Sequence, residues 1–232
     1  MHLDILSGGA ARGLVEALRP EFNAATGCEL RASFSAVGAM HEQLLAGTPC
    51  DVIILTAPLI ESLAREGRVD SASVATLGAV PTGIAVRAGD APPNVSSGDA
   101  LRAALLSAPA IFVPDTERST AGIHVLRMLH ALGIHAEVAA RVRTYPNGAT
   151  AMRELAQSRR ANAIGITQVS EIIATIGVAL VGELPAGFEL AAVYVAAAVA
   201  TAREPALARR FTALLAGPTA AAARKRAGFR SA

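Results

Sequence analysis

Apolar and polar positions change their spacing repeatedly along this chain. Runs of consecutive apolar residues predict strands at 2–6, 29–34, 51–55, 78–87, 110–113, 141–145, 163–166, 178–181 and 189–199. Between them, apolar residues recur at helical spacing and predict helices at 10–26, 39–46, 58–66, 98–106, 121–132, 149–158, 168–175, 205–215 and 218–227. Strands that alternate with helices of about 10–15 residues are typical of βαβ units. We therefore predict an α/β fold with mostly parallel sheets and helices on both faces.

Two strand candidates are longer than the others and do not fit this alternation. One lies in GAVPTGIAVRAG and the other in FELAAVYVAAAVA, just before the last two helices. A strand that leaves a first lobe and a strand that returns to it would form a hinge. We therefore predict lobe I at residues 1–81 plus 190–232 and an inserted lobe II at 82–189, with a ligand cleft between them.

Four predicted strand-to-helix junctions are rich in small polar residues. In open α/β sheets, ligands bind outside the carboxyl ends of the strands. Helix starts there offer unpaired N–H groups and the positive end of the helix dipole, which favour an anion. Helix capping is the better explanation of any single junction, but two junctions in each lobe, all aimed at one cleft, favour an anion site. The junctions are Ser7-Gly8-Gly9-Ala10, Ser35-Ala36-Val37-Gly38, Arg118-Ser119-Thr120-Ala121-Gly122 and Asn147-Gly148-Ala149-Thr150.

Several other kinds of site are excluded by spacing. Ala10 stands where a dinucleotide-binding G-x-G-x-x-G motif needs its second glycine, and no G-x-x-x-x-G-K-[ST] motif exists. Ser7 lacks the G-x-S-x-G elbow of serine hydrolases. Since no His or Cys spacing indicates a metal site either, we expect neither a metal nor a cofactor.

Composition and charge narrow the classes of partner. The chain has 232 residues, 52% of them hydrophobic and 17% charged, and a formal net charge of +2, which together predict a globular protein. Basic residues are scattered except for Arg224-Lys225-Arg226, so we expect no nucleic acid partner. The longest apolar run, 190–200, is too short for a membrane span, which takes about 20 residues. Cys28 and Cys50 are interpreted as reduced structural thiols rather than a disulfide.

The segment FNAATGCELRASFSAVGAMHEQLLAGTPCDVIIL resembles the periplasmic molybdate-binding proteins, which are type II solute-binding proteins of ABC transporters. The family's later segments are similar to TAGIHVLRMLHALGI, to ANAIGITQVSEI and to residues 181–229 of this chain. The resemblance implies a type II periplasmic-binding-protein fold that binds a small anion. It places the anion at Ser7, Ser35 and the N–H groups after them. In the second lobe it implies the turn 120–122, the helix start near Gly148 and position 168.

Two residues depart from the pattern of the family and leave the ligand open. The molybdate binders commonly have Tyr where this chain has Gln168. Arg118 adds a guanidinium, which pairs well with planar carboxylates, although a solvated loop charge is an equally good interpretation. The predicted ligand is therefore either an oxyanion such as molybdate or a small di- or tricarboxylate. The predicted ligand-binding residues are Ser7, Gly8, Gly9, Ser35, Ala36, Val37, Arg118, Ser119, Thr120, Gly122, Asn147, Gly148 and Gln168.

The aconitate isomerases are similar to this family as well, which leaves an isomerase of a polycarboxylic acid as the alternative function. Such an enzyme needs a positioned base. The candidates are Glu117, His124, Tyr145 and Tyr194, and no motif singles out one of them. Because no export signal precedes the first strand, we expect a cytoplasmic monomer for the sequence as written. If its N-terminus is a processed one, we expect a periplasmic protein with an ABC transporter as partner.

Overall fold

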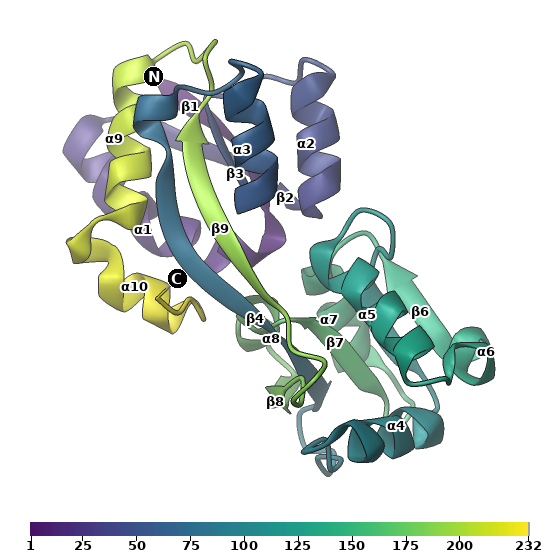
Figure 1. Cartoon of the computed structure of the whole chain (residues 1–232). Coiled ribbons are helices and arrows are strands. Elements are labelled where there is room, and N and C mark those ends of the chain that lie inside the picture. Colours follow the sequence, from purple (N-terminus) through teal and green to yellow (C-terminus); the bar gives the residue numbers. More distant parts are fainter. Residues whose placement is uncertain (232) are drawn as a thin grey trace. The chain divides into compact units, whose positions relative to one another are not determined.

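The computed structural model describes residues 1–231 and divides into two compact units (Figure 1). Unit 1 comprises Met1–Val80 together with the chain from Ala192 onward. Unit 2 is the continuous segment Pro81–Ala191. Two strands, β4 (Ala75–Arg87) and β9 (Ala191–Ala198), run across the limits of the units in sequence.

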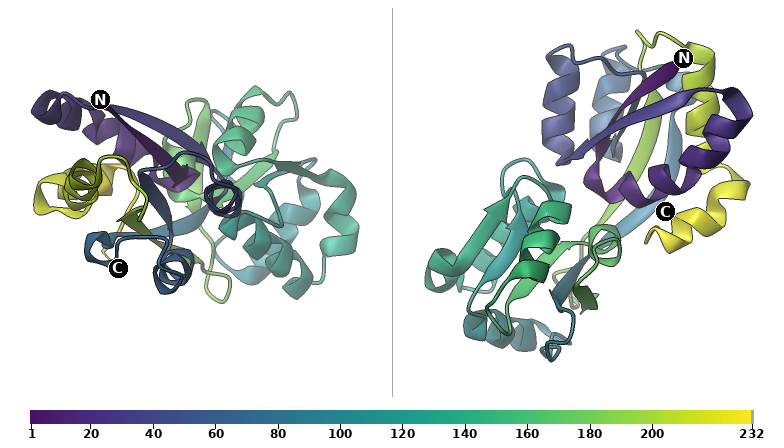
Figure 2. Two further views of the ribbon diagram at one scale, coloured as in Figure 1. Left: turned by 90° about the horizontal axis from the view of Figure 1, so that it is seen from above. Right: turned by 180° about the vertical axis from the view of Figure 1, so that it is seen from behind.

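Unit 1 is built on three parallel strands in the order β2-β1-β3, with β9 antiparallel to β3. In chain order it contains β1 (His2–Gly8), η1 (Gly9–Ala11), α1 (Arg12–Thr26), β2 (Glu29–Ser35), α2 (Val37–Leu45), β3 (Val52–Thr56), α3 (Ala57–Arg65), η2 (Ser71–Ser73), the first part of β4, β9, α9 (Pro205–Ala216), η4 (Pro218–Ala220) and α10 (Ala221–Arg226). Helices α1, α9 and α10 cover one face of this sheet, and α2 and α3 cover the other (Figures 1 and 2).

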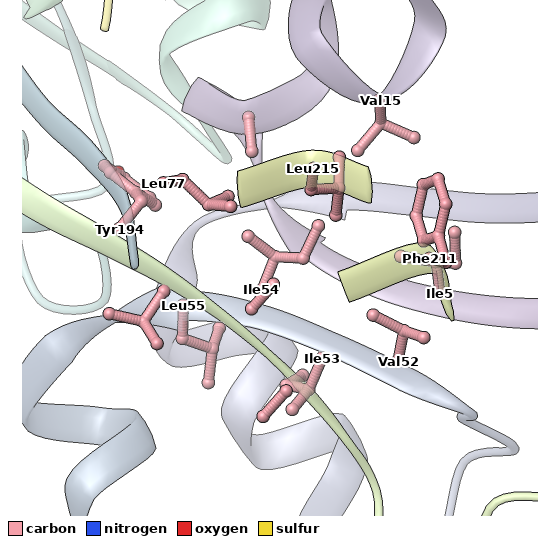
Figure 3. Packing of buried hydrophobic residues seen from close by; sticks show 14 of the residues in the cluster. Ile5, Val15, Val52, Ile53, Ile54, Leu55, Leu77, Tyr194, Phe211 and Leu215 are labelled. Atoms are coloured by element: carbon pink, nitrogen blue, oxygen red, sulfur yellow. The ribbon is translucent and has the colours of Figure 1, made fainter. Parts of the chain in front are cut away.

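The core of unit 1 forms around β3, because both faces of this strand are covered by helices. All five of its residues are buried, and its side chains point alternately to the two faces (Figure 3). On one face, Phe211 of α9 lies edge-on to Phe22 of α1, with ring centroids 5.0 Å apart. Residues from the end of the chain therefore complete a core that begins at the first strand.

A charged network closes the amino end of the same sheet. Buried Asp51 accepts hydrogen bonds from the backbone N–H groups of Asp4 and Arg203, both at 2.8 Å. The Arg203 guanidinium also donates to Asp51 Oδ2 at 2.8 Å. Burial raises the pKa of Asp51, but these hydrogen bonds outweigh it, and the net effect holds the pKa below its usual value. The network ties β1 and β3 to the segment that precedes α9.

Unit 2 has a second mostly parallel sheet, in which β5 (Ile111–Pro114) is parallel to β6 (Val142–Tyr145) and to β7 (Ile164–Gln168). The second part of β4 runs antiparallel to β7 and to β8 (Val178–Glu183). One apolar cluster joins this sheet to α4 (Gly98–Ser107), α5 (Thr120–Ala131) and α6 (His135–Val138), and another joins it to α7 (Gly148–Gln157) and α8 (Val169–Ile173). A short helix η3 (Ala139–Arg141) precedes β6.

The predicted α/β class with mostly parallel sheets is confirmed, and each predicted strand is present. One predicted boundary is wrong in a way that matters for the site: Gln168 is the last residue of β7 and does not belong to a helix. The short helix α6 was not predicted, because four residues are too few to show a helical period. Cys28 and Cys50 are buried free thiols, as predicted. Burial raises the pKa of Cys50 to about 12, so its thiol stays protonated and unreactive.

Candidate functional site

In unit 1, the carboxyl ends of three parallel strands meet at one edge of the sheet. Ser7 pairs with Phe34 of β2 and with Ile54 of β3, and Gly8 pairs with Ser35. The strand ends at Gly8, Ser35 and Thr56 therefore lie next to one another, and each leads directly into a helix. Thr56 belongs to this edge although the sequence analysis did not select it; its position after the apolar run VIIL is the signal that could have found it.

These helix starts leave backbone N–H groups without side-chain caps, although Pro58 in the first turn of α3 has no N–H. Within residues 1–231, no side chain caps η1, α2 or α3, whose N-cap residues are Gly8, Ala36 and Thr56, and no acidic residue lies in their first turns. In α2 the first helical bond runs from the Met40 N–H to the Ala36 carbonyl, so the N–H groups before Met40 have no partner within the helix. Together with the helix dipole, this arrangement suits a negative charge.

The two predicted serines differ in their surroundings. The Ser7 side chain is fully buried, and its hydroxyl donates to the Gly8 carbonyl at 2.9 Å. To donate to an anion, this hydroxyl would have to rotate and give up its hydrogen bond to the Gly8 carbonyl. Ser35 is half-buried at the end of β2, directly across from Gly8.

Gly8 has no space for a side chain. A Cβ atom there would lie 2.7 Å from Val37 Cγ1 and 3.0 Å from Tyr194 Cε1. Tyr194, which pairs with Thr56 across β3 and β9, therefore stands beside the end of β1, where its ring meets Phe229 edge-on. The glycine lets the helix start and the tyrosine ring approach the backbone. Gly9, the next predicted residue, opens η1.

In unit 2, two of the predicted residues are helix caps. The Asn147 side chain accepts a hydrogen bond from the Thr150 N–H at 2.8 Å, and Ser119 Oγ accepts from the Gly122 N–H at 3.4 Å. Gly122 is needed for close packing, because a Cβ there would lie 2.1 Å from the Asp115 carbonyl oxygen. Thr120, half-buried, is the first residue of α5.

Arg118 lies on an exposed turn that Asp115 organises. The Asp115 carboxylate accepts hydrogen bonds from the backbone N–H groups of Glu117 at 2.8 Å and of Arg118 at 2.9 Å. The turn places the Arg118 side chain at the carboxyl edge of β5, two residues before the start of α5. Its role toward a ligand stays a prediction.

The helix start at Gly148 already holds a carboxyl group of the protein itself. The buried Glu171 carboxyl accepts a hydrogen bond from Thr167 Oγ1 at 2.6 Å and others from the N–H groups of Gly148, Ala149 and Gln168. A Cβ on Gly148 would lie 1.9 Å from Glu171 Oε2. Burial is the largest influence and raises the pKa of Glu171, while these hydrogen bonds act in the opposite direction. The Gly148 amide, predicted to bind a ligand, therefore points at Glu171.

Gln168 ends β7, where it lies directly opposite Thr82 of β4. Its side chain is only 3% exposed, yet neither its amide nitrogen nor its amide oxygen has a partner among residues 1–231. The hydroxyls of Thr82 and Ser170 are buried and unpartnered in the same way. Sequence reasoning missed Thr82 and Ser170, because nothing in a single strand shows which hydroxyl lacks a partner.

The four candidate bases lie in different surroundings. His124 Nε2 is 2.8 Å from the Phe188 carbonyl, which anchors the ring on its own chain. Tyr145 stacks on Phe112 with 5.8 Å between ring centroids, and burial raises its pKa, which disfavours its ionised form. Tyr194 is buried in unit 1, whereas Glu117 is exposed in unit 2.

Residues 1–231 contain neither a cluster of metal-binding side chains nor a membrane-spanning helix. No group of three or more His, Cys, Asp or Glu side chains in this part of the chain is placed to hold a metal ion. No helix there is long and apolar enough to cross a membrane.

The model of one protein family, described as bacterial extracellular solute-binding protein, matches residues 3–230. The chain belongs to this family. The predicted resemblance to solute-binding proteins is therefore confirmed. The match spans both units, so each of them belongs to the solute-binding fold.

Proteins similar to this solute-binding protein are named for several different ligands or substrates. An aconitate isomerase from Pseudomonas sp. is 28% identical over 98% of this chain and 87% of its own length. The periplasmic molybdate-binding protein of Azotobacter vinelandii superposes with a TM-score of 0.81 at 20% identity, covering 99% of both chains. The sulfate-binding protein SubI of Mycobacterium tuberculosis gives a TM-score of 0.78 at 21% identity, covering 100% of this chain and 87% of its own. At these identities the two structures show a shared fold.

Proposed function

We propose that this solute-binding protein binds a small anion, either an oxyanion or a small di- or tricarboxylate. The observation that carries the proposal is the edge of unit 1 where three uncapped helix starts follow adjacent parallel strands. We assign Ser7, Ser35 and the backbone N–H groups of residues 8, 9, 36 and 37 to the anion in this unit. In unit 2 we assign Arg118, Ser119, Thr120, Gly122, Asn147, Gly148 and Gln168, some of which would act by shaping the helix starts rather than by direct contact.

The kinds of ligand found among relatives support an anion. The similar structures include proteins named for molybdate and for sulfate, and the similar curated protein is named for a polycarboxylic acid. All of these ligands are anions at neutral pH. Helix N-termini and hydroxyl groups can bind either a tetrahedral oxyanion or a planar carboxylate, because their hydrogen bonds are short and adaptable.

Thermal unfolding with a panel of anions tests the proposal. Molybdate, sulfate, citrate and malate would each be added at millimolar concentration, and a ligand at 100 times its Kd adds about 2.7 kcal/mol to the free energy of unfolding. We expect at least one of them to raise Tm. If none does, the proposed function is wrong.

Arg118→Ala separates the two ligand shapes. A guanidinium forks well onto a planar carboxylate, so we expect this variant to lose carboxylate binding and to keep binding of a tetrahedral oxyanion. Arg127→Ala, which removes an exposed guanidinium from α5, is the control and should change neither. Equal loss of both ligands in Arg118→Ala would contradict the assigned role.

The sequence similarity to an aconitate isomerase, at 28% identity, favours a second candidate function, the isomerisation of a small polycarboxylic acid. Such a reaction moves a proton on carbon and requires a base. Proton exchange into bound acids in D2O, followed by NMR, detects this chemistry without knowledge of the product. Exchange with a tightly bound acid, lost in one of the variants Glu117→Gln, His124→Gln, Tyr145→Phe or Tyr194→Phe, would favour the enzyme.

We further propose a transporter as the partner of this protein, and a monomeric state. The family is described as extracellular, which supports action outside the cytoplasm. Fractionation of cells that produce the natural gene product tests the location, and light scattering of the purified protein tests the monomer. Recovery from the cytoplasmic fraction alone would contradict a transporter partnership.

A further inference from the structure

Three buried polar side chains of unit 2 have no hydrogen-bond partner in the described chain. They are Thr82, Gln168 and Ser170, with exposed fractions of 1%, 3% and 5%. Six buried side-chain atoms among residues 1–231 are unpartnered in this way, and four of them belong to these three residues. The shortage of partners is therefore concentrated in one place.

The three residues are neighbours in the fold. Thr82 and Gln168 lie directly opposite each other on the antiparallel strands β4 and β7, so their side chains stand on the same face of the sheet. Ser170 follows Gln168 by two residues, in the first turn of α8. Val169 lies between Gln168 and Ser170 in the chain. Its side chain packs against β4, because a Cβ on Gly83 would lie 2.8 Å from Val169 Cγ2.

Buried polar groups without hydrogen bonds lower the stability of the fold unless another molecule supplies the missing partners. A buried polar group without a partner costs about 1–3 kcal/mol, and apolar residues of similar size would avoid the cost. Buried polar groups are otherwise almost always paired, so a cluster of unpaired ones indicates a bound molecule, either a ligand or ordered water.

The chemistry of the unpaired atoms restricts what can bind. The Gln168 amide nitrogen and the two hydroxyls can all donate to an acceptor. The Gln168 amide oxygen can only accept, so it needs an O–H or N–H donor from the ligand. A fully ionised oxyanion or carboxylate has no such donor and would leave this oxygen unpaired.

A hydroxyl group on the ligand meets these requirements. It donates to the Gln168 amide oxygen and accepts from the Gln168 amide nitrogen or from the Ser170 hydroxyl.

We infer that Thr82, Gln168 and Ser170 hold the hydroxyl end of a hydroxycarboxylic acid. The inference rests on the proposed anion-binding function, whose other groups would hold the carboxylates. It selects a hydroxylated organic acid over a tetrahedral oxyanion and over an acid that lacks the hydroxyl.

Paired ligands test the inference on the whole protein. Malate, as both enantiomers, and succinate differ by one hydroxyl, and molybdate has no donor. Titration calorimetry should give at least one enantiomer of malate a Kd about tenfold lower than that of succinate, which corresponds to about 1.4 kcal/mol. Gln168→Met, which keeps the size of the side chain, should bring malate and succinate to within about threefold of each other. Ser170→Ala and Thr82→Val should reduce the difference by smaller factors.

The matched control is Gln157→Met, which makes the same change at an exposed position of α7 in the same unit. It should keep the tenfold preference. Urea unfolding of each variant shows whether it is folded.

Each other outcome is decisive. Equal affinity for malate and succinate, or tight molybdate with no malate binding, overturns the inference and leaves the proposed function standing. A hydroxyl preference that Gln168→Met does not change overturns it too, and indicates that buried water alone pairs these atoms. If no anion binds at all, the proposed function itself fails.

Discussion

Glu171 makes the stability of unit 2 depend on pH. Its folded pKa lies above the ordinary value of 4.5, because burial disfavours the charged carboxylate. A raised pKa means that the folded state binds this proton more tightly than the unfolded state does. The contribution of Glu171 to stability is therefore complete below about pH 4.5 and is lost as the pH rises through the folded pKa.

Glu171→Gln should remove this dependence. The amide cannot ionise, so we expect the variant to gain in free energy of unfolding relative to the parent between pH 4.5 and pH 7.5, with a slope of at most about 1.4 kcal/mol per pH unit. Urea unfolding at several pH values measures the difference. Glu154→Gln, which makes the same substitution at an exposed position of α7, is the control for the change itself. A relative stability that falls with pH in Glu171→Gln would show that the folded pKa is not raised.

At the scale of the element, α7 depends on its cap. Asn147→Ala removes the side-chain oxygen that the Thr150 N–H needs, and should lower the free energy of unfolding by about 1 kcal/mol. Asn147→Ser supplies another capping oxygen and should recover most of this loss. Because the cap already engages the Asn147 oxygen, we expect the Kd for an anion to change less than twofold, as calorimetry can measure. A tenfold loss of affinity in Asn147→Ala, with stability unchanged, would make this residue a ligand contact instead.

The elements themselves follow from local patterns, and the sequence predicts them with few errors. Apolar runs such as VIIL at β3 are buried on both faces, which is why a continuous run is a sufficient signal. The contents of the candidate site do not follow in this way. Gly148 follows β6 and Glu171 follows β7, and the two residues come into contact only because β6, β5 and β7 are neighbours in the sheet. The spacing of apolar residues along the chain does not predict this contact. A sequence pattern predicts a helix start, whereas the group that occupies it depends on residues far away in the chain.

At the scale of the whole molecule, the two units differ in how the chain builds them. Unit 2 is continuous and has its own apolar clusters, so we expect residues 81–191 expressed alone to fold and to unfold cooperatively in urea. Residues 1–80 alone should not fold, since β9 and Phe211 are missing from their core. Circular dichroism of both fragments during a urea titration tests these two predictions. Cooperative unfolding of residues 1–80 would contradict this account.

The split of unit 1 over two distant segments also has a consequence during synthesis. A ribosome adds roughly 5–20 residues per second, so the first strands wait on the order of ten seconds before β9 and α9 leave the exit tunnel. Throughout that time the apolar surface of β1 and β3 is without the helix and strand that later cover it. The rate of elongation through residues 81–191 therefore sets how long this apolar surface stays exposed on the nascent chain.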